Sequence, residues 1–290
     1  MRLSIAHTTT YAYDLSFCGD TYMEARLRPL TAAGQQACHE FRLSTQPESP
    51  VFEYGLSGEG GSVSHFTVKD LGHDRLVIRA ESIVETMLGN PFETVELGAT
   101  DWDRLADPDL RNAQAEWLGP TGLTRYDGDL GLPNLPREGV FEFGQALTAF
   151  IHGQFEYVPG STDVSTPLET VVRQRRGVCQ DYAHFMIAAA RSAGVPARYV
   201  SGYVFSGSDR TTLGSDATHA WVELFIPHSG AWIGFDPTNN VVAADRHVKI
   251  ATGRDYTDVP PTKGLLRPSR GCPLPGRTDL IVDVRVAAVE

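Results

Sequence analysis

The stretch "RRGVCQDYAHFM" places Cys179 where a loop becomes a helical pattern, which runs on to about Gly194. A thiol at a helix N-terminus meets unpaired backbone N–H groups and the positive end of the macrodipole, so it should ionise more readily than a free thiol. Its own backbone N–H also faces any anion bonded to the sulfur, which is half of an oxyanion hole. Cys179 is therefore a candidate nucleophile, and a small buried cysteine is the alternative.

A thiol nucleophile needs a base that takes its proton and later gives it to the leaving group, which is usually histidine. His184 is the nearest histidine, but five residues at about 100° each turn it roughly 140° away from Cys179 on a helix. Asp181 also points away from the thiol. We therefore expect His184 to be a packing residue and the base to come from another segment.

The segment "THAWVELFIPHSGAWIGFDPTN", residues 218–239, supplies a base and a carboxylate. Apolar residues alternate along 219–226, and "PHSG" predicts a four-residue hairpin loop. If Ile226 faces Ala231, His219 and Asp236 share a face and lie diagonally one pair apart, within reach of each other. The carboxylate would then hold the imidazole in one tautomer and stabilise the imidazolium.

Two other histidines compete with His219 for the role of base. His228 lies in the predicted hairpin loop, and His247 lies in "ADRHVK". Neither has a carboxylate predicted on the same face nearby, so both rank below His219.

The composition is that of an ordinary globular protein, with 41% hydrophobic and 21% charged residues in 290. The net charge of −11 argues against a surface that neutralises phosphates, so no nucleic-acid partner is expected. No apolar run approaches the roughly 18 to 20 residues of a membrane span, and the first residues alternate like a strand instead of forming a signal peptide. These features predict a soluble, cytoplasmic protein with no membrane partner.

The four cysteines are scattered, without C-x-x-C spacing. Cys18, Cys38, Cys179 and Cys272 therefore suggest neither a disulfide framework nor a zinc site, and we expect all four to be free thiols. The chain also lacks H-E-x-x-H and clustered ligand spacing. No metal and no cofactor are expected.

The periodicity of the chain predicts strands first, helices in the middle and strands at the end, which is an α+β fold. The predicted strands are 2–13, 21–28, 38–45, 62–69, 74–86, 197–205, 219–226, 231–236 and 279–289. The glycine-rich residues 55–62 are interpreted as a hairpin loop, since no helical pattern follows them. Helices are predicted over 107–119, 138–153 and 166–177, the last with Thr166 in a capping box and Pro167 at its first position.

Three blocks of the sequence resemble the catalytic blocks of the transglutaminase-like superfamily, in particular its bacterial members described as cysteine proteases. These blocks are "RRGVCQDYAHFM", "DATHAWVELFIP" and "WIGFDPTN", in this order. The segments "TPLETVVRQRRG", "GVPARYVSGY" and "GRDYTDVPP" are also similar to the bacterial group, and "HTTTYAYD…ARLRPL" resembles its N-terminal β domain. The resemblance implies a papain-like core with Cys179 as nucleophile, His219 as general base and acid, and Asp236 as the residue that orients His219.

The resemblance also implies a domain division and a reaction. Residues 1–95 would form the N-terminal antiparallel β domain, and residues 96–290 the transglutaminase-like catalytic domain. The implied reaction is acyl transfer from a peptide or glutamine-type amide through a thioester. Hydrolysis is favoured because the calcium sites and extra barrel domains of animal transglutaminases have no counterpart here; transamidation by a glutamyltransferase and an inactive binding scaffold are the alternatives. Related enzymes use a second oxyanion donor, for which only Tyr157 and Gln154 are candidates.

Overall fold

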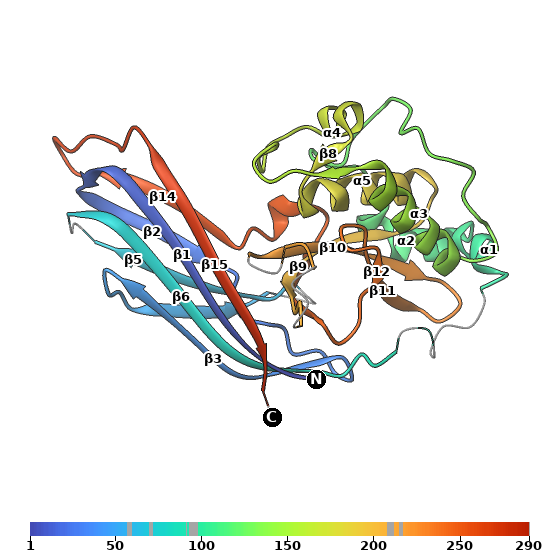
Figure 1. Cartoon of the computed structure of the whole chain (residues 1–290), viewed down its shortest axis with the longest axis horizontal. Coiled ribbons are helices and arrows are strands. Elements are labelled where there is room, and N and C mark those ends of the chain that lie inside the picture. The colour runs from blue at the N-terminus through green and yellow to red at the C-terminus, as the bar shows by residue number, and fades with distance from the viewer. Residues whose placement is uncertain are drawn as a thin grey trace.

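The computed structural model describes residues 1–56, 60–69, 72–90, 92, 98–207, 212–214 and 217–289. Figure 1 shows two bodies side by side, a sandwich of long strands and a helix-covered sheet. The two chain ends lie near each other at one end of the strand sandwich. No helix within the described ranges is long and apolar enough to span a membrane.

The β domain consists of two antiparallel sheets packed face to face. Within the described residues each sheet has four strands, in the orders β15-β1-β6-β3 and β14-β2-β5-β4. The strands are β1 (Arg2–Phe17), β2 (Gly19–Ala25), β3 (Gln36–Gln46), β4 (Val51–Gly55), β5 (Ser62–Val68), β6 (His73–Thr86), β14 (Thr262–Pro268) and β15 (Thr278–Ala288). Alternating residues such as Met23, Phe66 and Ile78 point inward and form a core of their own.

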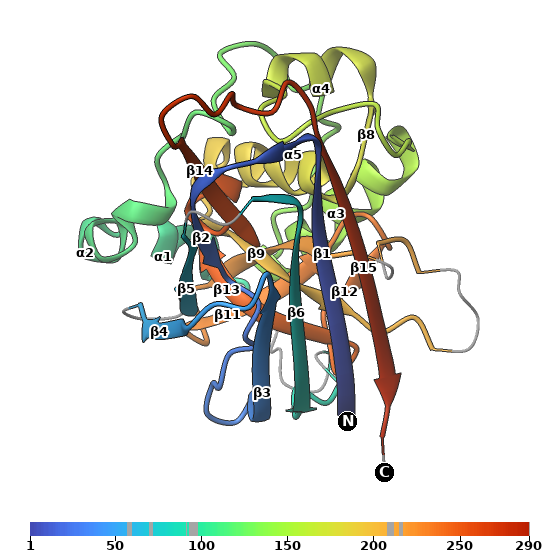
Figure 2. The ribbon, with the colours of Figure 1, turned by 90° about the vertical axis from the view of Figure 1, so that its left-hand side faces the viewer.

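The last two strands correct the predicted domain division, which placed residues 96–290 in the second domain. Strand β15 pairs with β1 from Leu3↔Ala288 to Tyr13↔Thr278, and β14 pairs with β2. Figure 2 shows β3, β6, β1 and β15 running side by side. The chain therefore returns to the β domain after the second body, and chain position alone does not separate the two bodies.

The cysteine prediction is wrong for two of the four residues. Cys18 and Cys272 form a disulfide between the end of β1 and the loop that joins β14 to β15, 254 residues apart in sequence. Cys38 and Cys179 are free thiols. Disulfides persist in oxidising compartments and are rare in the cytosol. The bond therefore weighs against the cytoplasmic location, which stays a prediction.

The second body is an antiparallel sheet with helices on one face. In the described part of the chain the sheet has five strands, in the order β12-β11-β10-β9-β13. They are β9 (Ala197–Val204), β10 (His219–Ile226), β11 (Ala231–Asp236), β12 (Val241–Val242) and β13 (His247–Gly253). The helices α3 (Val140–Gln154) and α5 (Cys179–Ser192) cover the face that presents Ala220, Val222 and Leu224, and together they form the main core.

The predicted helices are found in the structure, but some of them begin or end at other residues than predicted. Helix α3 matches residues 138–153, and α2 (Pro108–Ala113) has the predicted N-cap at Asp107, but the chain then forms a 3₁₀ turn, η1 (Ala115–Trp117), instead of continuing to Gly119. Helix α4 (Leu168–Gln174) starts two residues after Thr166, whose hydroxyl instead bonds within a turn to Asp163. A short helix α1 (Asp101–Leu105) and the turn η2 (Tyr256–Asp258) complete the described helical segments.

The strand predictions are confirmed where polar and apolar residues alternate. Strands β4 and β5 pair antiparallel, which confirms the hairpin interpretation of residues 55–62, although 57–59 lie outside the described residues. The sequence did not predict β4, β13 and β14 or the two-residue strands β7 (Glu156–Tyr157), β8 (Arg176–Gly177) and β12. Every residue of β13 is buried, including His247, Lys249 and Thr252, so its polar residues do not mark a solvent-facing side.

Gln36 joins the β domain to the sheet of the second body. Its side chain is buried; Nε2 donates to the carbonyls of Leu30 and Lys249 (both 2.8 Å), and Oε1 accepts the N–H of Lys249 (2.8 Å). Lys249 lies on β13, so one amide of the β domain holds both backbone groups of a residue in the other body.

Substituting Gln36→Leu is expected to lower the free energy of unfolding by about 2 to 4 kcal/mol, because it leaves buried backbone groups without partners. Urea denaturation measures the change. The control Gln154→Leu replaces an exposed amide at the end of α3 and should cost less than about 0.5 kcal/mol. Equal losses in the two variants would contradict this role of Gln36.

Candidate active site

Cys179 is the first residue of α5, as the helical spacing predicts. Val178 before it is extended, so the chain enters the helix from the short strand β8 and leaves the first N–H groups of α5 without intrahelical partners. The cysteine is 9% exposed, so its thiol lies at the edge of the core and still reaches the surface. This position offers the thiol both the helix dipole and its own backbone N–H.

The first turn of α5 is held by Asp181. Its Oδ2 accepts the N–H of Val178 (2.8 Å) and the hydroxyl of Thr162 (2.6 Å). Burial raises the pKa of Asp181, and these hydrogen bonds oppose the rise. A Cβ at Gly177 would lie 2.5 Å from Oδ2, so only glycine lets the chain pass this close to the cap.

His184, on the next turn of α5, is buried. Its Nε2 accepts the N–H of Tyr256 (3.3 Å), and its ring lies 5.3 Å from that of Tyr199. Burial lowers the pKa of His184 to about 4, so the ring is neutral at physiological pH. Its contacts agree with the prediction of a packing residue.

The hairpin of β10 and β11 has the predicted register. Ile226 pairs with Ala231 and Val222 with Phe235, which leaves residues 227–230 as the loop. His219 opens β10 and Asp236 ends β11, so the two lie at the same end of the hairpin. Nε2 of His219 is 2.8 Å from Oδ2 of Asp236, and both side chains are fully buried.

The electrostatics of His219 favour a charged ring. Burial lowers the pKa of His219, but the charge and hydrogen bond of Asp236, together with Cys179, outweigh burial and raise the pKa to about 10. Nδ1 is buried and has no partner of ordinary hydrogen-bond geometry within the described residues. Because Nε2 is occupied by Asp236, Nδ1 is the nitrogen left to take a proton from Cys179.

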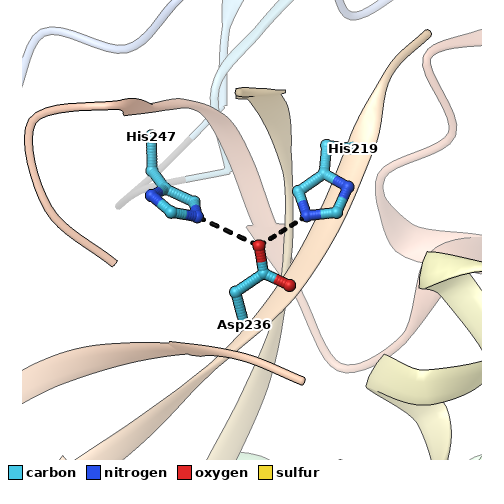
Figure 3. A group of neighbouring side chains, drawn as sticks. All are labelled: His219, Asp236 and His247. Atoms are coloured by element: carbon cyan, nitrogen blue, oxygen red, sulfur yellow. Dashed lines mark hydrogen bonds and ion pairs between the residues drawn. The ribbon is translucent and has the colours of Figure 1, made fainter. Parts of the chain in front are cut away.

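The carboxylate of Asp236 accepts more hydrogen bonds than the sequence indicated. Figure 3 shows the rings of His219 and His247 both directed at the same oxygen, Oδ2, with Nε2 of His247 at 3.1 Å. Nδ2 of Asn239 also donates to Oδ2 (2.8 Å), and Oδ1 accepts the N–H groups of Thr238 (3.0 Å) and Asn239 (3.2 Å). Burial would raise the pKa of Asp236, but His219 and His247 outweigh burial and hold the pKa well below its usual range.

His247 corrects the ranking of the histidines, since it does have a carboxylate within reach. The sequence missed it because β13 was not predicted and reaches Asp236 from the opposite edge of the sheet. His228 also has a carboxylate: its Nδ1 is 2.8 Å from Oδ1 of Asp101, a residue of α1. No contact places His228 near Cys179 within the described structure, so it is not a rival base.

His219, Asp236 and His247 have the residue types of a metal site, with ligand atoms within 4.8 Å of one another. Three N–H donors, however, converge on the single oxygen Oδ2, two from the histidines and one from Asn239. An ion bound there would displace at least two of these hydrogen bonds. Hydrogen bonding therefore explains this cluster without a metal.

Asn239 extends the site to the loop before β10. Its Oδ1 accepts the N–H of Leu213 (2.8 Å), and its Nδ2 donates to the Leu213 carbonyl (3.3 Å) as well as to Asp236. The next residue, Gly214, has a φ of +78°, and a Cβ there would lie 2.6 Å from Nδ1 of His219. The backbone at Gly214 thus covers the imidazole at close range, which requires glycine.

Of the two candidate oxyanion donors, only Tyr157 lies beside the thiol segment. Tyr157 on β7 pairs in parallel with Gly177 on β8, and Val158 donates its N–H to the Gly177 carbonyl (2.9 Å). Gln154 is exposed at the end of α3. Position in the fold therefore favours Tyr157 for this role.

A buried ion triad braces the sheet next to the site. Glu223 on β10 contacts Arg198 of β9 and Lys249 of β13, each at 2.6 Å. All three side chains are nearly buried, and they lie on the same face of the sheet as His219 and Trp221. This triad ties together the strands that carry His219 and His247.

A thiol at the start of a helix, packed on an antiparallel sheet that carries a histidine–carboxylate pair, is typical of the papain-like, transglutaminase-like class of fold. The model of the transglutaminase-like superfamily matches residues 135–237, and that of the bacterial transglutaminase-like N-terminal region matches residues 3–85. An uncharacterized protein of Mycobacterium tuberculosis is 32% identical over 278 residues, which cover 91% of this chain and 87% of the relative. The chain belongs to the transglutaminase-like superfamily.

Two further proteins are similar to this chain. A protein from Cytophaga hutchinsonii, whose crystal structure is described as that of a "putative cysteine protease", has a TM-score of 0.73. It is 23% identical, and the match covers 100% of this chain and 91% of the other, so it supports the fold. A protein-glutamine gamma-glutamyltransferase of Pseudomonas aeruginosa is 36% identical over 104 residues, which cover 33% of this chain and 15% of the relative.

Proposed function

We propose that this protein is a cysteine-dependent acyl-transfer enzyme that hydrolyses peptide or glutamine-type amides through a thioester. The observation that carries the proposal is the buried pair of His219 and Asp236, whose Nε2 and Oδ2 are 2.8 Å apart, together with Cys179 at the first residue of α5. Cys179 also contributes to the raised pKa of His219, which supports the thiol as the partner of Nδ1.

The proposed reaction moves two protons through His219, one in each half. Nδ1 takes the proton of the Cys179 thiol, and the thiolate attacks the amide carbonyl. The oxyanion that forms meets the backbone N–H of Cys179, with Tyr157 as the second candidate donor. Nδ1–H then protonates the leaving amine as the C–N bond breaks, which leaves a thioester on Cys179. A water gives a proton to Nδ1 and attacks the thioester. The C–S bond then breaks, the acid leaves, and Nδ1–H returns the proton to the sulfur of Cys179.

Transamidation is the second candidate, in which a primary amine replaces that water. The match to the glutamyltransferase of Pseudomonas aeruginosa favours it. The two reactions share the thioester and differ in what reaches it, so their products distinguish them. A binding scaffold with no activity is the remaining alternative.

Incubating the whole protein with a peptide library, with and without a primary amine, tests the proposal by mass spectrometry. We expect Cys179-dependent peptide cleavage or glutamine deamidation, with Cys179→Ala as the blank. Amine adducts in place of hydrolysis products would favour the glutamyltransferase. Identical products from wild type and Cys179→Ala would rule out the enzyme and leave the scaffold.

A further inference from the structure

The contact between His247 and Asp236 has no part in the reaction steps above. Nε2 of His219 and Nε2 of His247 lie 2.8 and 3.1 Å from the same oxygen, Oδ2 of Asp236. His247 is 5% exposed, and Trp221 packs beside both histidine rings, with centroids 6.2 and 5.2 Å away. The second histidine is therefore built into the site and is not a surface residue near it.

The hydrogen bonds fix the protonation of His247. An ionised carboxylate only accepts hydrogen bonds, so Nε2 of His247 must carry a hydrogen. Nδ1 of His247 is buried and has no partner within the described residues. His247 therefore faces Asp236 with an Nε2–H donor.

Because His247 and His219 donate to the same oxygen, the carboxylate of Asp236 is a weaker base toward His219. Each N–H donated to a carboxylate stabilises the anion and makes it less basic. A less basic carboxylate attracts the Nε2–H of His219 less strongly, so the imidazolium gives up its proton at Nδ1 more easily. A base that must later act as an acid requires this balance.

We propose that His247 is a positioning residue of this site: by donating to the oxygen that holds His219, it limits how strongly Asp236 retains the imidazolium. The inference rests on the proposed role of His219 as base and acid. It assigns a role to a residue that never touches the substrate.

The β domain sets the place of His247. His247 opens β13, and Gln36 of β3 holds both backbone groups of Lys249 two residues later. The hydroxyl of Thr86, the last residue of β6, donates to the Asp245 carbonyl (2.7 Å) just before β13. The β domain therefore holds the backbone of β13 in place, and the side chain of His247 connects this strand to Asp236.

The described contacts bring other titratable and charged groups to this cluster. They are Cys179 of α5, His152 of α3, Glu223 of β10, Lys249 of β13 and Arg198 of β9, with Asp245 and Arg246 just before His247 in the chain. The ion triad joins one anion, Glu223, to two cations, Lys249 and Arg198, so it carries a net positive charge. Nδ1 of His152 lies 3.0 Å from the Thr238 carbonyl. A cavity of about 90 Å³ between the two bodies is lined by His247, Trp221 and Glu223, and it leaves room for a substituted side chain at 247.

NMR of the ¹⁵N-histidine-labelled whole protein tests the proposal without any amide substrate. In His247→Leu we expect the Nε2–H proton of His219 to resonate further downfield at neutral pH. The imidazolium should titrate roughly one pH unit higher than in wild type. In His247→Gln, whose amide can donate to Oδ2, both values should return toward wild type. The control His7→Leu removes a buried histidine of β1, bonded to Tyr203 and Thr9, and should move neither value.

Two results would overturn the proposal. One is an unchanged His219 proton and titration in a folded His247→Leu protein. The other needs no variant: a wild-type spectrum in which neutral His247 carries its hydrogen on Nδ1. If His247→Leu does not fold, the wild-type spectrum and the His219 values of His247→Gln still test the proposal. A negative peptide-library experiment would not change these NMR measurements. The proposed activity and the proposed role of His247 can therefore be contradicted independently.

Discussion

Replacing Cys179 by serine is expected to lower the rate of acyl transfer at least about 10³-fold, as for other nucleophiles of a catalytic triad. The hydroxyl is similar in size, so the packing at the start of α5 should remain. Serine does not ionise near neutral pH, and Nδ1 of His219 would have to remove a far more tightly held proton. The rate is measured on the peptides that the library experiment identifies.

Cys38 is the matched control for this experiment, because it is the other free thiol. It lies half-buried on β3 of the β domain, where burial raises its pKa, so it should be the less reactive of the two. Cys38→Ser should keep the wild-type rate. If Cys179→Ser kept the rate and Cys38→Ser lost it, the nucleophile would lie in the β domain and the proposed site would be wrong.

The local part of the site could be predicted from the sequence, since it depends on short-range geometry. A four-residue loop and period-2 alternation are enough to place His219 beside Asp236. Helical spacing and the residues before it are enough to place Cys179 at a helix start. The fold class follows in the same way from the order of periodic segments.

The parts that the sequence did not reveal depend on pairing between distant segments. Strand β15 pairs with β1 across almost the whole chain, and the disulfide of Cys18 and Cys272 follows from the same return. His247 lies on β13, the edge strand of the sheet, and reaches Asp236 on β11 although β9 and β10 lie between these two strands. Neither pairing has a local signal, because the partner and the register of a strand are decided by tertiary packing.

Asp236→Asn is expected to lower acyl transfer about 10²- to 10⁴-fold and to destabilise the fold by about 2 to 4 kcal/mol. An asparagine can orient a catalytic histidine where its amide nitrogen has an acceptor. Here both oxygens of Asp236 face donors: two histidine nitrogens and the Asn239 amide on one side, two backbone N–H groups on the other. Either orientation of the new amide therefore sets N–H groups against N–H groups.

The same substitution should change how stability depends on pH. In wild type the folded pKa of His219 is about 10, above its ordinary value of 6.5, so the ion pair contributes fully below pH 6.5 and is lost as the pH rises toward 10. Without the carboxylate, burial lowers the pKa of His219, and this alkaline loss disappears. Urea denaturation between pH 6.5 and 10 should show a slope in wild type that Asp236→Asn lacks.

Asp101→Asn is the control that separates chemistry from folding. Asp101 is also fully buried and also accepts from a histidine, His228, as well as from the backbone N–H groups of His228 and Val140. Its loss should destabilise the fold to a similar degree, because the same kind of buried hydrogen bonds is removed. The folded fraction of Asp101→Asn should still transfer acyl groups at the wild-type rate. Equal loss of activity in the two variants, after correction for the folded fraction, would show that Asp236 acts only through stability and would remove it from the mechanism.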